Sequence, residues 1–223
     1  KGILAMFIGH FGVGLAAKKI DSKPSLGTLF IASQFIDLLW PVFLLFGIEK
    51  VQIEQGNTAM TPLNFVSYPY SHSLFGVFVW AILLGAIYYM LKKNFRTSLL
   101  LGLLVLSHWI LDLITHRPDL QLLPWSDFKM GFGLWNSVVL TIIIEGFIFI
   151  LGAYFYLSAT KPENKKGSYG LWSLLIFLIL IYVMNIVGPP PSDTNVSAIA
   201  IVGLFQWLLV AWGYWIDRNR SAV

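Results

Sequence analysis

The sequence predicts an all-α membrane protein, a polytopic helical bundle with about seven transmembrane segments. Its composition is 57% hydrophobic and only 12% charged, whereas soluble domains carry about 25% charged residues. The apolar residues also gather in stretches of about 20, the length that a helix needs to cross the hydrocarbon core of a bilayer. Together these observations exclude an ordinary soluble domain.

Six stretches are long enough to span a membrane, and a seventh, residues 3–17, is shorter. The short one contains Gly9, Gly12 and Gly14, so we expect it to cross obliquely or to re-enter. In chain order the six long stretches are residues 26–46, 73–91, 97–115, 134–157, 169–187 and 196–216.

The chain is expected to form one integral-membrane domain over residues 1–223, because the longest stretch outside the predicted spans is only residues 47–71. Residues 1–160 carry the candidate site, and residues 161–223 form two packing helices joined by the GPPPSDTN loop. The absence of cysteine excludes disulfides, thiolate metal ligands and a cysteine nucleophile. No nucleic-acid partner is expected, since the basic residues are spread along the chain instead of forming one patch.

The distribution of Lys and Arg predicts the orientation. With the N-terminus outside, eleven basic residues fall on one side of the membrane and four on the other. The positive-inside rule places the eleven in the cytoplasm, so the N-terminus is predicted outside and the C-terminus inside. The eleven are Lys18, Lys19, Lys23, Lys92, Lys93, Arg96, Lys161, Lys165, Lys166, Arg218 and Arg220, and the four are Lys1, Lys50, Arg117 and Lys129.

All four histidines of the chain lie in or beside apolar stretches, together with three carboxylates. An ionised carboxylate in a hydrophobic span costs about 2.5 to 3.5 kcal/mol on insertion scales, so these groups need a partner that offsets the loss. A bound metal would provide one. The candidate ligands are His10, Asp37, His72, His108, Asp112 and His116, and Asp37, Asp112 and Glu145 are the candidate catalytic carboxylates.

Spacing and depth bring these residues together. His108, Asp112 and His116 are four residues apart, so on a helix they project from one face. At about 1.5 Å per residue, His10, Asp37 and Glu145 lie near mid-membrane in the outer half. We therefore expect one outward-opening polar cavity and nothing comparable at the cytoplasmic side. The local pair alone is weak evidence, because His108 and Asp112 fit a buried hydrogen-bonded pair equally well.

Four segments resemble a known family. FIGHFGVG, ASQFIDLLWP, YPYSHSLFG and SHWILDLITHRPD are similar to motifs of the YdjM-like membrane-bound metal-dependent hydrolases, which are bacterial inner-membrane proteins. The resemblance covers residues 1 to about 160. It extends distantly to the zinc-dependent phospholipases C and the single-strand nucleases of the same superfamily, all-helical enzymes that hydrolyse phosphoesters with a metal cluster.

The resemblance implies particular ligands. Asp37, His72, His108 and Asp112 would bind one divalent ion, most simply zinc, and His10 with a bridging Asp112 would bind a second. The chain has no N-terminal Trp and no later His-x3-carboxylate pair to match the soluble enzymes. His116 and Glu145 are substitutes for those missing ligands, so we expect one or two ions instead of three.

The implied function is metal-dependent hydrolysis of a phosphoester, with a lipid or lipid-linked phosphate as the substrate and membrane lipids as partners. The predicted location is the bacterial inner membrane, with the site on the periplasmic side. Three rivals remain open: a transporter or proton pathway using intramembrane His, Asp and Glu, a bis-histidine haem protein using His10 and His108, and a non-catalytic scaffold stapled by metal.

In the outer loop, Asp119 and Asp127 favour turn or cap roles, and Arg117 fits a phosphate ligand or an interfacial anchor. A serine nucleophile at Ser71 is not expected, because adjacency should place its side chain and that of His72 on different faces.

Overall fold

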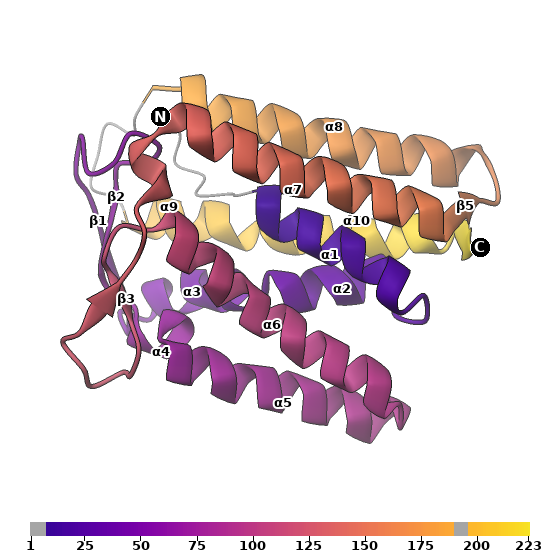
Figure 1. Cartoon of the computed structure of the whole chain (residues 1–223), viewed down its shortest axis with the longest axis horizontal. Coiled ribbons are helices and arrows are strands. Elements are labelled where there is room, and N and C mark those ends of the chain that lie inside the picture. Colours follow the sequence, from indigo (N-terminus) through magenta and orange to yellow (C-terminus); the bar gives the residue numbers. More distant parts are fainter. Residues whose placement is uncertain (1–7, 190–195) are drawn as a thin grey trace.

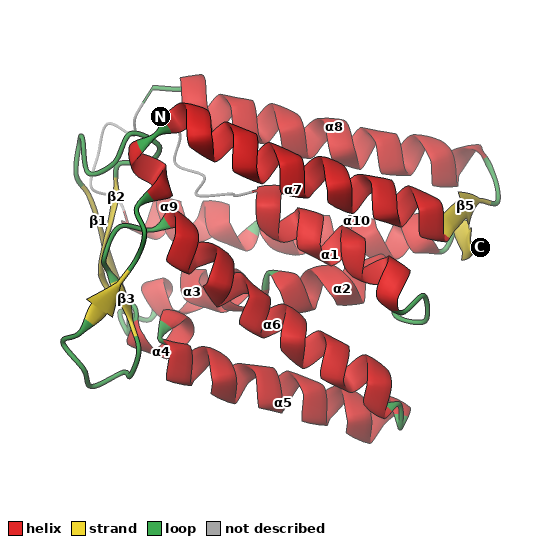
Figure 2. Ribbon diagram, viewed as in Figure 1, coloured by secondary structure: helices red, strands yellow, loops and turns green. Residues whose placement is uncertain are grey.

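The computed structural model describes residues 8–189 and 196–223, and in these the fold is mainly helical (Figures 1 and 2). Five helices are long and apolar enough to cross a membrane, counting α9 and α10 as one. The helices are α1 (Ile8–Ile20), α2 (Leu26–Ser33), α3 (Phe35–Leu45), α4 (Pro69–His72), α5 (Leu74–Lys92), α6 (Phe95–Thr115), α7 (Val138–Ala159), α8 (Lys165–Val187), α9 (Val196–Leu204) and α10 (Gln206–Asp217), with a 3-10 turn at Leu134–Asn136.

Two of the predicted spans differ from a simple crossing helix. Residues 26–46 form two helices, α2 and α3, that meet at an angle of 60° and make a sixth span if they are taken together. The first predicted stretch appears as α1, which has 13 described residues. The remainder of that stretch and most of the GPPPSDTN loop lie outside the described residues. A membrane protein with five or six candidate spans is therefore shown, and the seventh span and the orientation remain predictions.

Three short strand pairs, which were not predicted, accompany the helices. β1 (Lys50–Ile53) pairs with β2 (Leu63–Ser67) in an antiparallel hairpin within residues 47–71, the longest stretch outside the predicted spans. Alternating burial along β2, with Leu63 and Phe65 inside, gives this stretch the period-two pattern of a strand. Two smaller antiparallel pairs are β3 (Leu120–Gln121) with β4 (Lys129–Met130) and β5 (Thr160–Pro162) with β6 (Arg220–Ala222).

The bundle has two distinct ends. Figure 1 shows β1, β2 and β3 at one end, and the α1–α2 turn, the α5–α6 turn, β5 and the C-terminus at the other. All eleven basic residues assigned to the cytoplasm lie in segments at this second end, while Lys50 and Lys129 lie in the strands of the first. Lys1 is outside the described residues. The basic residues thus gather at one end of the bundle, and the orientation of that end in the membrane remains a prediction.

Close packing of α1 against α7 places α1 inside the bundle. A Cβ atom added to Gly152 would come within 2.0 Å of the Gly12 carbonyl oxygen, and one added to Gly12 within 2.8 Å of the Ile148 oxygen. Glycine at these positions permits the close helix contact that is common between membrane helices. Phe11 and Leu15 of α1 are fully buried, so α1 carries its polar residues into the protein interior.

Thiol labelling tests the orientation in a chain that has no natural cysteine. Asp127 lies in the exposed β3–β4 loop and Glu163 in the exposed turn before α8, at opposite ends of the bundle. In intact cells, Asp127→Cys should react with a membrane-impermeant maleimide, and Glu163→Cys should react only after the membrane is permeabilised. The reverse pattern would place the histidine cluster at the cytoplasmic end.

Candidate metal centre

The candidate ligands come from four helices that meet inside the bundle. His10 lies on α1, Asp37 in the first turn of α3, His72 at the end of α4, and His108 with Asp112 on α6. His116 follows the last residue of α6 directly. All except Asp37 are buried, and the Asp37 side chain is 15% exposed. The helices therefore bring together every histidine of the chain.

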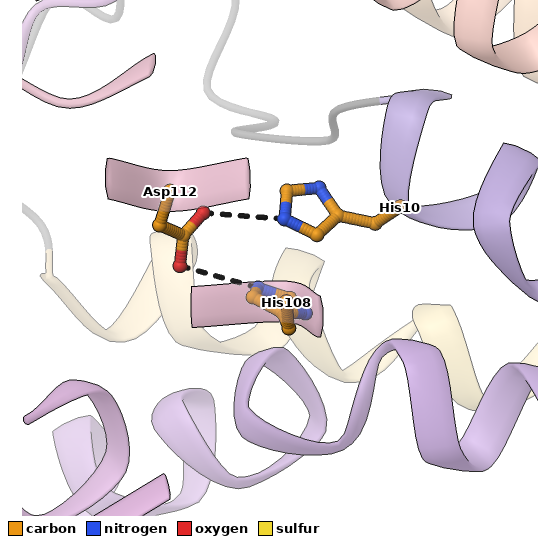
Figure 3. A group of neighbouring side chains, drawn as sticks. All are labelled: His10, His108 and Asp112. Carbon is orange, nitrogen blue, oxygen red and sulfur yellow. Dashed lines mark ion pairs between the residues drawn. The ribbon is translucent and has the colours of Figure 1, made fainter. Parts of the chain in front are cut away.

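Asp112 is the centre of the cluster. Its Oδ1 lies 3.2 Å from His10 Nε2 and 3.9 Å from His116 Nε2. Its Oδ2 lies 3.5 Å from His108 Nε2 and 3.9 Å from His72 Nε2. Figure 3 shows the carboxylate beside the rings of His10 and His108, with one oxygen toward each ring. One carboxylate thus faces the Nε2 atoms of all four histidines.

Asp37 provides a second carboxylate on the same cluster. Its Oδ1 is 3.3 Å from His72 Nε2, and its Oδ2 is 3.6 Å from His108 Nε2. Two overlapping ligand groups result, namely His10–His108–Asp112 and Asp37–His72–His108, and within each the potential ligand atoms lie within 4.8 Å of one another. His108 belongs to both groups, which fits either one shared ion or two neighbouring ions.

Hydrogen bonds on the opposite ring nitrogens orient these histidines. His108 Nδ1 lies 2.7 Å from the Ser33 carbonyl oxygen at the α2–α3 bend. A carbonyl only accepts, so Nδ1 carries a proton and the neutral ring presents the Nε2 lone pair to Asp37 and Asp112. The Trp109 indole N–H donates to the His72 carbonyl at 3.0 Å and fixes α4 against α6.

Two carboxylates outside the cluster, Glu49 and Asp119, orient the rings of His72 and His116. His72 Nδ1 lies 2.6 Å from Ser71 Oγ, whose hydroxyl donates to Glu49 at 2.6 Å. His116 Nδ1 lies 2.9 Å from the carboxylate of Asp119. Carboxylate–histidine pairs of this kind are typical of metal sites, where the outer carboxylate fixes the tautomer and raises the basicity of the ligand.

The distances within the cluster suit a shared cation. Two ligands bound at about 2.0 Å in a tetrahedral arrangement lie about 3.3 Å apart, close to the separations between the histidine Nε2 atoms and the two aspartates. Most of these gaps are longer than a good N–H···O hydrogen bond, and Asp112 Oδ2 is buried without a hydrogen-bond partner among the described residues. Imidazole and carboxylate together favour zinc and similar divalent ions. The residues therefore fit a metal.

Glu145 and Arg117 lie beside the cluster and belong to neither ligand group. Glu145 of α7 is buried and lines a narrow crevice with Gly9 and His10. Arg117 Nη2 donates to Asn64 at 2.6 Å, and its Nε is 3.5 Å from Asp119. Arg117 is thus held at the edge of the site, and its predicted roles as phosphate ligand or interfacial anchor remain predictions.

Local electrostatics affect two groups outside the spanning helices. Burial raises the pKa of Tyr68 well above its usual value, and the nearby Asp119 carboxylate adds to the effect. Tyr68 therefore keeps its proton and donates to Asp119 at 2.5 Å. At His72 burial opposes the charged form, but Asp37 and Asp112 outweigh it and the pKa of His72 is raised. The negative charge that has this effect is the charge that a divalent cation would neutralise.

Sequence reasoning missed the outer residues of the site. Asp119 is 4% exposed and its carboxylate pairs with the His116 ring. The predicted turn or cap role therefore left out its contact with a candidate metal ligand. Ser71 and His72 were expected on different faces, which is wrong: at the end of the four-residue helix α4 their side chains meet. Ser71 donates its proton to Glu49 and accepts from His72, so it is a relay and not an activated nucleophile. For Asp119, its position three residues after His116 was the available signal, whereas Glu49 lies far from His72 in the sequence and gave none.

Loss of an outer carboxylate should weaken metal binding without abolishing it. Asp119→Asn and Glu49→Gln should each lower metal affinity by about 10- to 100-fold, the usual effect of removing such a partner. Competition with a chelator of known affinity measures the change. Asp127→Asn, in the exposed loop beyond β3, is the matched control and should bind metal like the wild-type protein. Equal affinity in all four proteins would show that these hydrogen bonds do not support a metal.

Comparison with known proteins identifies the family. Neither the curated proteins nor the solved structures gave a match. The sequence profile of the YdjM inner membrane protein family matches residues 6–190, a range that includes every histidine and carboxylate of the cluster. The resemblance drawn from the four short segments is confirmed at family level, and the more distant phospholipase C resemblance finds no support in these comparisons. The chain belongs to the YdjM inner membrane protein family.

Proposed function

We propose that this protein is a membrane-embedded, metal-dependent hydrolase that acts on a phosphoester, with a lipid or lipid-linked phosphate as its substrate. One observation carries the proposal: four histidines present their Nε2 atoms to the buried carboxylate of Asp112. Hydrogen bonds from the surroundings also orient His72, His108 and His116. Such preorganisation is typical of a metal centre that supports chemistry.

Asp37, His72, His108 and Asp112 would hold one divalent ion, preferably zinc, and His10 with Asp112 would hold a second, with His116 beside them. When bound, such ions lower the pKa of water to about 7 and polarise a phosphoryl oxygen. The residues of the protein would balance the charge of the ions and orient the ligands. Asp112 balances positive charge at the centre, and the outer carboxylates keep the histidine lone pairs directed inward.

In this proposal two carboxylates would move the proton. Asp37 is the one cluster ligand with part of its side chain exposed, so a substrate would approach from its side. Glu145 is buried beside His10 and interacts with Tyr182. We assign Asp37 as the proton acceptor for the attacking water, and Glu145 as a second acid–base group behind His10.

A lipid is the favoured substrate class because of where the cluster lies. It sits near one end of the spanning helices, at the start of α5 and the end of α6, and in this proposal the phospholipid headgroups would meet the protein at that level. The surrounding helices expose large apolar side chains, including Phe78 on α5 and Phe147 on α7. A phosphoester presented by a membrane would reach this level without leaving the bilayer.

The rival functions make different demands on the cluster. A bis-histidine haem is disfavoured, because the rings of His10 and His108 lie only 3.8 Å apart and leave no room for a porphyrin between them. A transporter would need a second polar route from the cluster to the other end of the bundle. A metal-stapled scaffold would keep the same ligands, so an activity measurement must separate it from an enzyme.

The test is a hydrolysis assay with detergent-solubilised protein. Phosphatidylglycerol, phosphatidic acid and a chromogenic phosphodiester are supplied with and without a chelator, and released phosphate or headgroup is measured. We expect turnover that chelation abolishes and zinc restores. A protein that hydrolyses none of these substrates, yet melts much earlier after chelation, would be a metal-stapled scaffold.

A further inference from the structure

A second polar site lies at the opposite end of the bundle, contrary to the expectation that nothing comparable would be found there. It is a pocket of about 380 Å³ between the α1–α2 turn and the C-terminal end of α10. Its lining includes four basic side chains, Lys18, Lys23, Arg218 and Arg220, and one acidic side chain, Asp217. The pocket therefore has an excess of positive charge.

Asp217 does not neutralise this excess, because its carboxylate is already occupied. It accepts hydrogen bonds from Lys18 Nζ at 2.5 Å, from the Leu26 backbone N–H at 2.7 Å and from the Tyr156 hydroxyl at 2.5 Å. Lys18 and Asp217 form a buried ion pair whose charges cancel. Three positive charges remain in the lining of the pocket.

Arg220 is the strongest indication of an anionic ligand. It is only 8% exposed, and its guanidinium donates to neutral acceptors: Thr160 Oγ1 and the Thr160 carbonyl, both at 3.0 Å, and the Gly167 carbonyl at 3.1 Å. Across residues 8–189 and 196–223, no carboxylate lies within ion-pair distance of Arg220. A buried charge without a counter-ion is costly, and two of its five N–H groups remain to bind one.

We propose that this pocket binds the phosphate group of an anionic phospholipid. Guanidinium groups match phosphate geometry, and the exposed Lys23 and Arg218 add charge at the mouth of the pocket. The spanning helices end at this level, the depth expected for headgroups. The predicted orientation places this end in the cytoplasm, and basic pockets between helices on the cytoplasmic side bind anionic headgroups. Inorganic phosphate shares the recognised chemistry, so the test must separate the two sources.

Native mass spectrometry of the purified protein provides the test. The protein is incubated with phosphatidylglycerol or phosphatidylcholine of identical acyl chains, and the bound fraction is measured with and without excess inorganic phosphate. Lys23→Ala/Arg218→Ala removes two charges from the mouth and spares the buried pair. Lys92→Ala/Lys161→Ala is the matched control, since it removes two exposed charges at the same end outside the pocket.

We expect the wild-type protein and the control to retain phosphatidylglycerol over phosphatidylcholine. The pocket variant should lose affinity by more than about tenfold, since each basic residue near the surface contributes roughly fivefold. Strong competition by inorganic phosphate, or equal binding of the two lipids, would overturn the lipid assignment. An equal loss of affinity in the control variant would show that lipid binding depends only on overall surface charge, and the proposed binding site in the pocket would be rejected. Phosphatidylglycerol bound or hydrolysed at the histidine cluster would be affected equally in all three proteins, so a loss confined to the pocket variant reports on the pocket alone.

Discussion

Asp112→Asn should nearly abolish metal binding and hydrolysis together. The substitution keeps the volume of the side chain but replaces one carboxylate oxygen with an N–H donor, which would face histidine nitrogens that must present lone pairs. Removing an outer partner costs about 10- to 100-fold, so the loss at a residue that faces four histidines should exceed about 100-fold in turnover. Metal content and released product are measured on the same preparation.

Asp127→Asn controls for the loss of one negative charge at the same end of the bundle, and it should behave as the wild type. The thermal melting of Asp112→Asn separates the two possible roles of the metal. Turnover lost with little change in melting indicates catalysis, whereas a large drop in melting with no activity in any of the proteins indicates a structural ion. Full turnover in Asp112→Asn would contradict its central role.

Lys18→Met should destabilise the fold strongly. Lys18 Nζ binds Asp217 at 2.5 Å and the Pro24 carbonyl at 2.8 Å, and the side chains of this ion pair are 7% and 9% exposed. Methionine keeps the apolar stem and leaves Asp217 as a buried charge with only two neutral donors. Breaking a buried pair in this way costs about 3 to 5 kcal/mol, which corresponds to a fall in melting temperature on the order of 10 °C.

The neighbouring Lys19 is exposed and supplies the control. Lys19→Met removes the same charge one residue along α1, and it should change the free energy of unfolding by less than about 0.5 kcal/mol. Melting curves are recorded in one detergent at one pH. Equal melting temperatures for the two variants would show that the Lys18–Asp217 pair does not join α1 to α10.

The sequence predicted the spanning helices well because a bilayer imposes a simple rule on length and apolarity. The limits of α6 and α8 differ from the predicted spans by only a few residues. The bend between α2 and α3 was not predicted, since residues 26–46 form one long, predominantly apolar stretch and tertiary packing decides where such a stretch turns. The hairpin of β1 and β2 was also missed, because strands of four and five residues leave little pattern.

The candidate site could be predicted where its ligands are close together in the sequence. His108 and Asp112 share a face of α6 because they are four residues apart, and the structure brings them together with His10, Asp37 and His72. Of the partners of these ligands, Asp119 lies three residues after His116 and could have been paired with it. Glu49 could not be predicted, since it reaches His72 only through Ser71, 22 residues further along the chain. Residues 161–223 were expected only to pack, yet Asp217 and Arg220 form the second polar site.

Elemental analysis of the purified protein tests the central claim most directly. Protein prepared in detergent without added metal is compared with His108→Ala, because His108 belongs to both ligand groups. The proposed centre predicts one or two equivalents of a divalent metal, preferably zinc, in the wild-type protein and less than half of that in the variant. A wild-type protein that binds no divalent metal even after reconstitution, or a His108→Ala variant that retains its full content, would contradict the metal centre.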